Sequence, residues 1–307
     1  MAKADNSTAI DCSAADAMQW SAEVLRMRFA EILNFSAAAL ISNDIEAVHD
    51  IRVATRRLRS AIRDFVPLTG KNSFRRLQKD LKDIADALGT ARDQDVAIAA
   101  LEKLQTKSDE AVIKEDIGKL IEERRAIREK AQTVLTQTLT GDDLNKLETR
   151  FAAAIDKALE KKAAAETVTV SATGRAVMLA RLKEFCDLSA ALYTPFGIRR
   201  LHRLRISAKR LRYAIELFVV CWQEQIVPFA REIAEMQTFL GELHDADVWI
   251  ENVSKRLRKS ETESPADLWL LSEFVKDRTK NYRGALNLWS KWKTERFFEK
   301  LRELISK

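Results

Sequence analysis

The chain has 307 residues, of which 46% are hydrophobic and 32% are charged, and its net charge at pH 7 is +6. This composition is typical of a folded protein and excludes a disordered basic chain, and the length allows two compact halves with separate cores. No apolar run reaches the length that crosses a bilayer, and the N-terminus lacks the apolar core of a signal peptide. The three cysteines lack metal-binding or redox spacing. We therefore expect a cytoplasmic protein that makes no membrane contact and favours acidic partners.

Helical periodicity recurs along the chain, and no segment shows the sustained alternation of a strand. With 8 Gly and 4 Pro, the chain has too few turn residues for an all-β fold. In the first half, helices are predicted over residues 18–41, 45–66, 72–89, 93–135 and, as a shorter piece, 142–160. In the second half, they are predicted over residues 172–194, 197–222, 225–241, 244–259, 265–289 and 292–306. The predicted fold class is therefore all-α.

Two helix boundaries and the domain division follow from local signals. Helical patterns are predicted to end at Gly89 and Gly241, because Gly commonly follows the last turn of a helix, and a nearby Asp then reads as the next N-cap. The division comprises a flexible N-terminal tail, a first helical half, a connector and a second helical half, with bounds 1–17, 18–160, 161–174 and 175–307.

Two motifs of the first half recur in the second. The basic segment HDIRVATRRLRSAIRDF (49–65) returns as HRLRISAKRLRYAIELF (202–218), and eight of the 17 positions are identical. The segment LGTARDQDV (88–96) returns as LGELHDADV (240–248). A duplicated sequence of this kind indicates a fold built from two like halves.

The cations of each basic segment lie on one side of its predicted helix. At about 100° per residue, those of the first copy fall within an arc of roughly 80°. We call this set the first ridge, and it consists of His49, Arg52, Arg56, Arg59 and Arg63. The second ridge consists of His202, Arg205, Lys209 and Arg212, with Tyr213 at its margin. An apolar stripe on another side of each helix suits a core, so the ridges are expected outside it.

A row of like charges on a helix is unfavourable, by about 0.2–0.5 kcal/mol per i,i+4 pair. A solvated face would more often mix signs, although carboxylates of other helices could neutralise the cations. Because two ridges match in the same frame, we favour a polyanion-binding surface, since an Arg fork can bind two phosphate oxygens at once. The cations near His49 and His202 oppose protonation until an anion binds. We therefore predict that both imidazoles donate to phosphate and that binding strengthens as the pH falls.

Both motifs resemble those of the CHAD family, the conserved-histidine α-helical domains. The resemblance rests on His49 to Arg59, on Leu201 to Tyr213 and on the repeated LGxx(R/H)DxDV element, and it covers nearly the whole chain after residue 20. It implies a stand-alone CHAD domain of two four-helix bundles related by a pseudo-two-fold axis. It also implies a basic central groove or channel between facing ridges that binds inorganic polyphosphate, and an association with polyphosphate granules. One departure is Glu216, which stands where the first ridge has Arg63.

Further cations are expected to contribute to polyphosphate binding from other helices. These secondary candidates are Arg75, Lys79, Lys82, Arg92, Arg125, Arg128, Arg278 and Arg283. We match Arg125 with Arg278 as equivalent positions of the duplication. His244 occupies the place of Arg92 in the second motif and reads as a further basic contact.

The leading hypothesis is a non-catalytic protein with no cofactor and no bound metal, because no nucleotide-binding loop or nucleophile motif is present. One alternative is a nucleic-acid-binding protein, but base stacking calls for aromatic residues among the cations, and only Tyr213 borders a ridge. Nucleic acid is thus expected only as a weak electrostatic competitor. A metal-dependent phosphohydrolase is the other alternative, and its only candidate ligands are Asp93, Asp95, Asp245 and Asp247. Oligomeric state and chain-length preference stay open.

Overall fold

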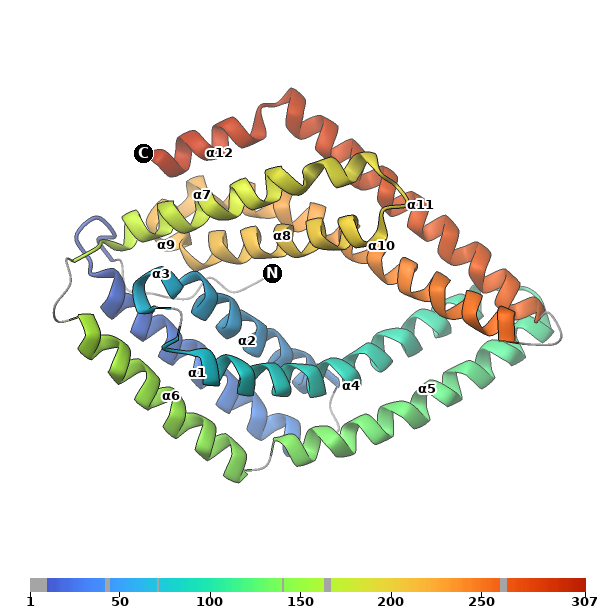
Figure 1. Cartoon of the computed structure of the whole chain (residues 1–307). Helices are drawn as coiled ribbons and strands as arrows, with labels where there is room; N and C mark the ends of the chain where they lie inside the picture. Colours follow the sequence, from blue (N-terminus) through green and yellow to red (C-terminus); the bar gives the residue numbers. More distant parts are fainter. Residues whose placement is uncertain (1–9, 42–44, 71, 140, 163–166, 260–263) are drawn as a thin grey trace. The chain divides into compact units, whose positions relative to one another are not determined.

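The structure is a computed structural model that describes residues 10–307 apart from 42–44, 71, 140, 163–166 and 260–263. Every regular element in these residues is helical, except for one isolated bridge between Asp16 and Thr169 (Figure 1). The predicted all-α fold class is therefore confirmed. No helix in the described part of the chain combines the length and apolar character that a membrane span requires.

The chain divides into two compact units. The first unit spans Met18–Thr167, and the second unit combines Met1–Ala17 with Val168–Lys307. The helices that follow in the first half of the chain are α1 (Ala17–Ile41), α2 (Ile45–Asp64), α3 (Val66–Thr69), α4 (Arg75–Lys107), α5 (Ala111–Thr138) and α6 (Gly141–Lys162). The second half contains α7 (Val170–Leu188), η1 (Ser189–Tyr193), α8 (Ile198–Leu217), α9 (Val219–Trp222), η2 (Gln223–Gln225), α10 (Val227–Lys259), α11 (Pro265–Thr294) and α12 (Phe297–Ser306).

The two units repeat one order of helices. The ridge helices α2 and α8 each have 20 residues, and the long helices α4 and α10 each have 33. In the first unit α2 packs on α4 and α4 pairs with α5, and in the second α8 packs on α10 and α10 pairs with α11 (Figure 1). The helix order therefore supports the duplication read from the motifs, and a two-fold relation between the bundles stays a prediction.

The apolar stripe of each ridge helix lies in the core of its unit. On α2, Ile51, Leu58 and Ile62 are fully buried, and on α8 the same holds for Leu204 and Leu211. Burying one such side chain stabilises a fold by about 1.5–3 kcal/mol. Burial of this stripe fixes the rotation of the helix about its axis, and the cations are then left on its outer sides.

The predicted helix ends at Gly89 and Gly241 are wrong. Helix α4 continues through Gly89 to Lys107, and α10 continues through Gly241 to Lys259. A Gly within a helix costs about 1 kcal/mol relative to Ala, but the apolar face that packs against neighbouring helices runs on past it. The N-cap reading of Asp93 and Asp245 is wrong for the same reason, because both lie inside continuous helices.

Residues 10–17 are not a free tail. The amide of Ala17 donates to Val168 O over 2.9 Å, and Val170 N donates to Ala15 O over 3.0 Å. Helix α7 therefore begins at Val170, inside the segment predicted as a connector. Amides in the first turn of a helix have no partner within the helix, and residues 10–17 supply carbonyls for two of them, Val170 N and Ser171 N. Residues 1–9, also predicted as tail, lie outside the described residues.

Candidate functional site

All five members of the first ridge lie on α2 with partly exposed side chains. Helix α2 packs on α4, so cations of α4 can lie beside the first ridge. The pKa of His49 is lowered, first by burial and then by the charge of Arg92. The pKa of Lys82 is raised by its contact with Asp86, against the opposing charge of nearby Arg59. Lys82 and Arg92, predicted as secondary contributors, therefore lie beside the first ridge.

His49 has an unsatisfied polar atom. Its Nδ1 is buried and has no hydrogen-bond partner among the described residues. A buried polar atom without a partner costs about 1–3 kcal/mol, so it favours a ligand or water that supplies one. Because the pKa of His49 is lowered, the imidazole is neutral at pH 7 and can donate from one nitrogen and accept at the other.

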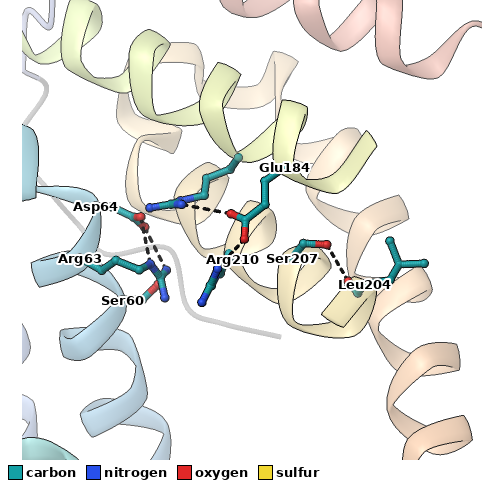
Figure 2. A network of polar contacts seen from close by, with 8 residues as sticks. Ser60, Arg63, Asp64, Glu184, Leu204, Ser207 and Arg210 are labelled. Atoms are coloured by element: carbon teal, nitrogen blue, oxygen red, sulfur yellow. Dashed lines mark hydrogen bonds and ion pairs between the residues drawn. The ribbon is translucent and has the colours of Figure 1, made fainter. Parts of the chain in front are cut away.

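The C-terminal end of the first ridge is partly neutralised within α2. Arg63 donates to Ser60 Oγ and lies 3.4 Å from a carboxylate oxygen of Asp64, whose side chain is fully buried. Figure 2 shows the Arg63 guanidinium turned toward both residues. Arg52, nearer the other end, lies 3.8 Å from Asp93, an exposed carboxylate on α4. At this end of the first ridge, Arg63 is therefore engaged by contacts with Ser60 and Asp64 of its own helix.

In the second ridge, His202 pairs with a histidine of α10. The Nδ1 atoms of His202 and His244 are 3.3 Å apart and the ring centres are 4.3 Å apart, so one imidazole donates and the other accepts. Burial lowers the pKa of His244 to about 4, and Arg205 and His202 act in the same direction. Burial also lowers the pKa of His202, with help from Arg205 and Lys209. Both rings are therefore neutral at pH 7.

Each ridge histidine is thus influenced by an Arg or His side chain of the neighbouring long helix. His49 is close to Arg92 of α4, and His202 is hydrogen-bonded to His244 of α10. His244 was read from the sequence as a basic contact and was not placed among the binding residues. Its position opposite Arg92 in the repeated motif was the signal that could have assigned it to the site.

At the C-terminal end of the second ridge, the position of Tyr213 differs from the one expected from the sequence. Arg212 lies 3.5 Å from Glu216 and stacks 5.0 Å above the ring of Tyr213. Tyr213 was predicted at the ridge margin, but only 6% of it is exposed. It therefore supports Arg212 from the core side.

Arg210 lies on α8 but is not a member of the second ridge. Its guanidinium donates to Glu184 of α7 (Figure 2). Glu184 also pairs with Arg181 at 3.1 Å. This side of α8 is therefore attached to α7 and is distinct from the second ridge.

Two of the secondary candidates belong to buried ion pairs. Arg128 lies 3.1 Å from Asp95, and Arg278 lies 2.6 Å from Asp247, with little exposure of any of the four side chains. The two aspartates hold the same place in the repeated motif, so Arg128 is the structural counterpart of Arg278. Our match of Arg125 with Arg278 is corrected accordingly. These pairs join α4 to α5 and α10 to α11.

The remaining secondary candidates lie on α4, α5 and α11. Arg125 is half exposed and pairs with Glu102 and Glu122 at 2.9 and 2.7 Å. Arg75 and Lys79 are exposed near the start of α4. Arg283 borders a shallow hollow of about 660 Å³ on α11, beside Phe239 of α10. In the residues that the structure describes, no three His, Cys, Asp or Glu side chains come together as a candidate metal site.

Comparisons with known proteins place this geometry in a wider context. The model of the CHAD domain family matches residues 23–254. The fold is similar to the crystal structure of the CHAD domain from the plant Ricinus communis, with 21% identity, a TM-score of 0.74 and coverage of 94% of each chain. It is also similar to PptA from Streptomyces chartreusis, with 17% identity, a TM-score of 0.67 and coverage of 90% of this chain and 100% of that one. No curated protein matches the chain.

Proposed function

The chain belongs to the CHAD domain family, and we propose that it binds inorganic polyphosphate through the first and second ridges without catalysing a reaction. Members of this family are known to bind polyphosphate. The same ligand explains the repeated cations, because a flexible chain with about one negative charge per phosphate can follow a row of guanidinium and ammonium groups. We expect the protein to associate with polyphosphate granules in the cytoplasm.

The observation that carries the proposal is that each ridge histidine lies within the electrostatic influence of an Arg or His side chain on the next long helix. The pairs are His49 with Arg92 and His202 with His244. Each imidazole is held neutral by burial and by nearby cations, and an incoming phosphate would reverse that electrostatic pressure. The site is therefore arranged so that anion binding is coupled to proton uptake.

The partners of the motif aspartates favour binding over hydrolysis. Asp95 and Asp247 are buried against Arg128 and Arg278, and Asp93 lies beside Arg52. A phosphohydrolase would need such carboxylates to hold Mg²⁺ near the phosphate. We expect no release of orthophosphate when the protein is incubated with polyphosphate and Mg²⁺ or Mn²⁺. Sustained turnover that is lost in Asp93→Asn would contradict the non-catalytic proposal.

The binding proposal is tested by titration with long-chain polyphosphate and with single-stranded DNA of matched charge at several salt concentrations. We expect polyphosphate to bind more tightly at ~0.2 M salt, where general counterion release is weakened. A triple variant, Arg52→Glu, Arg56→Glu and Arg205→Glu, should lose this binding.

The matched control reverses the same number of charges away from the ridges, as Lys119→Glu, Lys146→Glu and Lys183→Glu. These lysines are exposed and pair with carboxylates of their own helices. The control variant should retain polyphosphate binding. Equal loss in both variants, or equal affinity for the two polymers at every salt concentration, would mean that only net charge matters.

A further inference from the structure

The loop that leads into α8 exposes three large apolar side chains. Phe196 is 86% exposed, Tyr193 60% and Ile198 49%. The next turns of α8 add exposed arginines at 199, 200 and 203. No Asp or Glu occurs between Asp187 and Glu216, so the sequence of this surface carries only positive charge. An aromatic ring with most of its area in water, beside several cations, is typical of a binding surface.

The loop is firmly held, so this exposure does not come from a loose segment. Trp289 Nε1 donates to Tyr193 Oη over 2.9 Å, and Tyr282 Oη donates to Leu192 O over 2.6 Å. Arg278, fixed by its buried ion pair, donates to Pro195 O, and its guanidinium lies 5.8 Å from the centre of the Phe196 ring. Binding to a surface that is already ordered loses little conformational entropy.

The charges of this surface are unfavourable for α8 itself. The N-terminus of a helix is its positive end and favours carboxylates, but the first turn of α8 has none. Arg199 and Arg203 are also like charges at i,i+4. Arg199 lies three residues before His202, so it continues the second ridge toward Phe196. Because these arginines destabilise α8, their presence indicates that they bind an anion from outside the protein.

The sequence of the first unit does not repeat the positive charges of this surface. At the offset of 153 residues that relates the basic segments, Arg199 corresponds to Glu46 and Arg203 to Asp50. The ridges are common to both units, whereas the arginines at 199, 200 and 203 have no counterparts in the sequence of the first unit. It therefore has a role that the duplicated polyphosphate ridges do not require.

We propose that this surface binds single-stranded nucleic acid, with a base stacked on Phe196 and the phosphates held by Arg199, Arg200 and Arg203. Exposed aromatic rings among cations are the features that such binding uses, because every base has a face that can stack. Inorganic polyphosphate has no base and gains nothing from the ring. The proposal therefore goes beyond polyphosphate binding, and it replaces the expectation that nucleic acid is only a weak electrostatic competitor.

The test compares a labelled oligouridylate of about 15 nucleotides with an abasic strand of equal length and charge, using fluorescence anisotropy. The wild-type protein should prefer the strand with bases. Phe196→Ala should weaken its binding roughly tenfold, in keeping with the loss of one stacked base. The abasic strand should bind both proteins equally. Phe196→Leu, which keeps apolar bulk but removes the ring, should behave like Phe196→Ala.

Two controls separate this proposal from the polyphosphate site and from a folding defect. Phe196→Ala should leave the affinity for polyphosphate unchanged, whereas the triple ridge variant should lose polyphosphate. Met27→Ala removes an exposed apolar side chain on α1 and should change neither affinity. Equal binding of the two strands by the wild type would overturn the proposal. So would binding to anionic vesicles that Phe196→Leu retains and Phe196→Ala loses, because that pattern assigns the surface to a membrane.

Discussion

His202 and His244 lie in an environment that keeps both rings uncharged. The pKa of His244 is about 4, below its ordinary value, first because of burial and then because of the charges of Arg205 and His202. In the unfolded chain the same imidazole regains an ordinary pKa near 6.5. The unfolded state therefore binds more protons than the folded state between these two values, and folding stability rises with pH across that window.

The first prediction concerns this pH dependence. Without ligand, the free energy of unfolding should fall as the pH is lowered from about 6.5 to about 4. In His244→Gln the free energy of unfolding should fall less steeply with decreasing pH, because the substitution removes the imidazole with the largest pKa shift and retains hydrogen-bonding capacity. Urea denaturation at pH 7.5 and pH 5 measures both slopes, and parallel slopes would contradict the assignment. With polyphosphate present the loss should be smaller, because a bound anion raises the pKa of each imidazole and binding then tightens as the pH falls.

The ridge cations could be identified from sequence because their spacing alone places them on one side of a helix. The burial of Tyr213 and the exposure of Phe196 could not be identified in this way. Neighbouring positions on a helix differ by about 100°, so which of them is covered depends on the helices packed alongside. The meeting of His202 with His244 depends on the α8–α10 packing for the same reason.

At the scale of helices, local signals located most elements and failed where packing outweighed propensity. The bounds of α1 and α2 lie close to those predicted, whereas α12 ends at the predicted residue but begins later, at Phe297, because α11 continues to Thr294. The predicted helix ends at Gly89 and Gly241 were wrong, because a Gly residue considered without its packing context suggests the C-terminus of a helix. Buried contacts on both sides of these positions, such as Leu88 and Ala91 in α4, maintain the helix.

The second prediction tests the continuity of α4. Gly89 is inside the helix, and a Cβ at this position would meet nothing within 4 Å. Gly89→Ala should therefore raise the free energy of unfolding by about 0.5–1 kcal/mol. The contrasting variant is Gly70→Ala, because Gly70 has φ +81 and Ala is strained there. A loss of stability on Gly89→Ala, measured by urea denaturation, would restore the predicted helix end.

The third prediction concerns the ion pair that joins α4 to α5. Only 5% of the Asp95 side chain is exposed, and its partner Arg128 is also largely buried. Asp95→Ala leaves a buried guanidinium without its carboxylate and should cost about 3–5 kcal/mol. Asp93→Ala, two residues away on the same helix, should cost less than about 1 kcal/mol, because 71% of the Asp93 side chain is exposed. Similar losses of thermal stability in both variants would count against the structural role of the Arg128 pair.

At the scale of the whole molecule, the two ridges match along most of their length, but the charges at their ends are opposite in the two units. The first ridge follows Glu46 and ends in Arg63, whereas the second follows Arg199 and ends beside Glu216. The duplication could be read directly from the repeated motifs. The additional cation lies near the C-terminal end of α2 but near the N-terminal end of α8. The meaning of this difference could be recognised only after the structure showed that Phe196, just before α8, is exposed.

The fourth prediction is that both ridges contribute to polyphosphate binding. Neutralising two cations of the first ridge, as Arg52→Gln with Arg56→Gln, should lower the slope of log affinity against log salt by about 1.4, because each phosphate that a cation neutralises adds roughly 0.7 to that slope. Arg205→Gln with Lys209→Gln should do the same for the second ridge. The control is Lys119→Gln with Lys146→Gln, which should leave the slope unchanged. Isothermal titration at three salt concentrations gives the slopes, and an effect confined to one ridge would refute the shared role.

The attachment of residues 10–17 to the start of α7 has a consequence for biosynthesis. These residues leave the ribosome early, but their partners at 168–171 emerge only after the entire first unit has been made. At typical synthesis rates the delay is roughly 10–30 s, which is long compared with the folding time of most small domains. The first unit therefore has time to fold while the N-terminal segment still waits for its partner. Emergence of the start of α7 then allows residues 10–17 to form these hydrogen bonds.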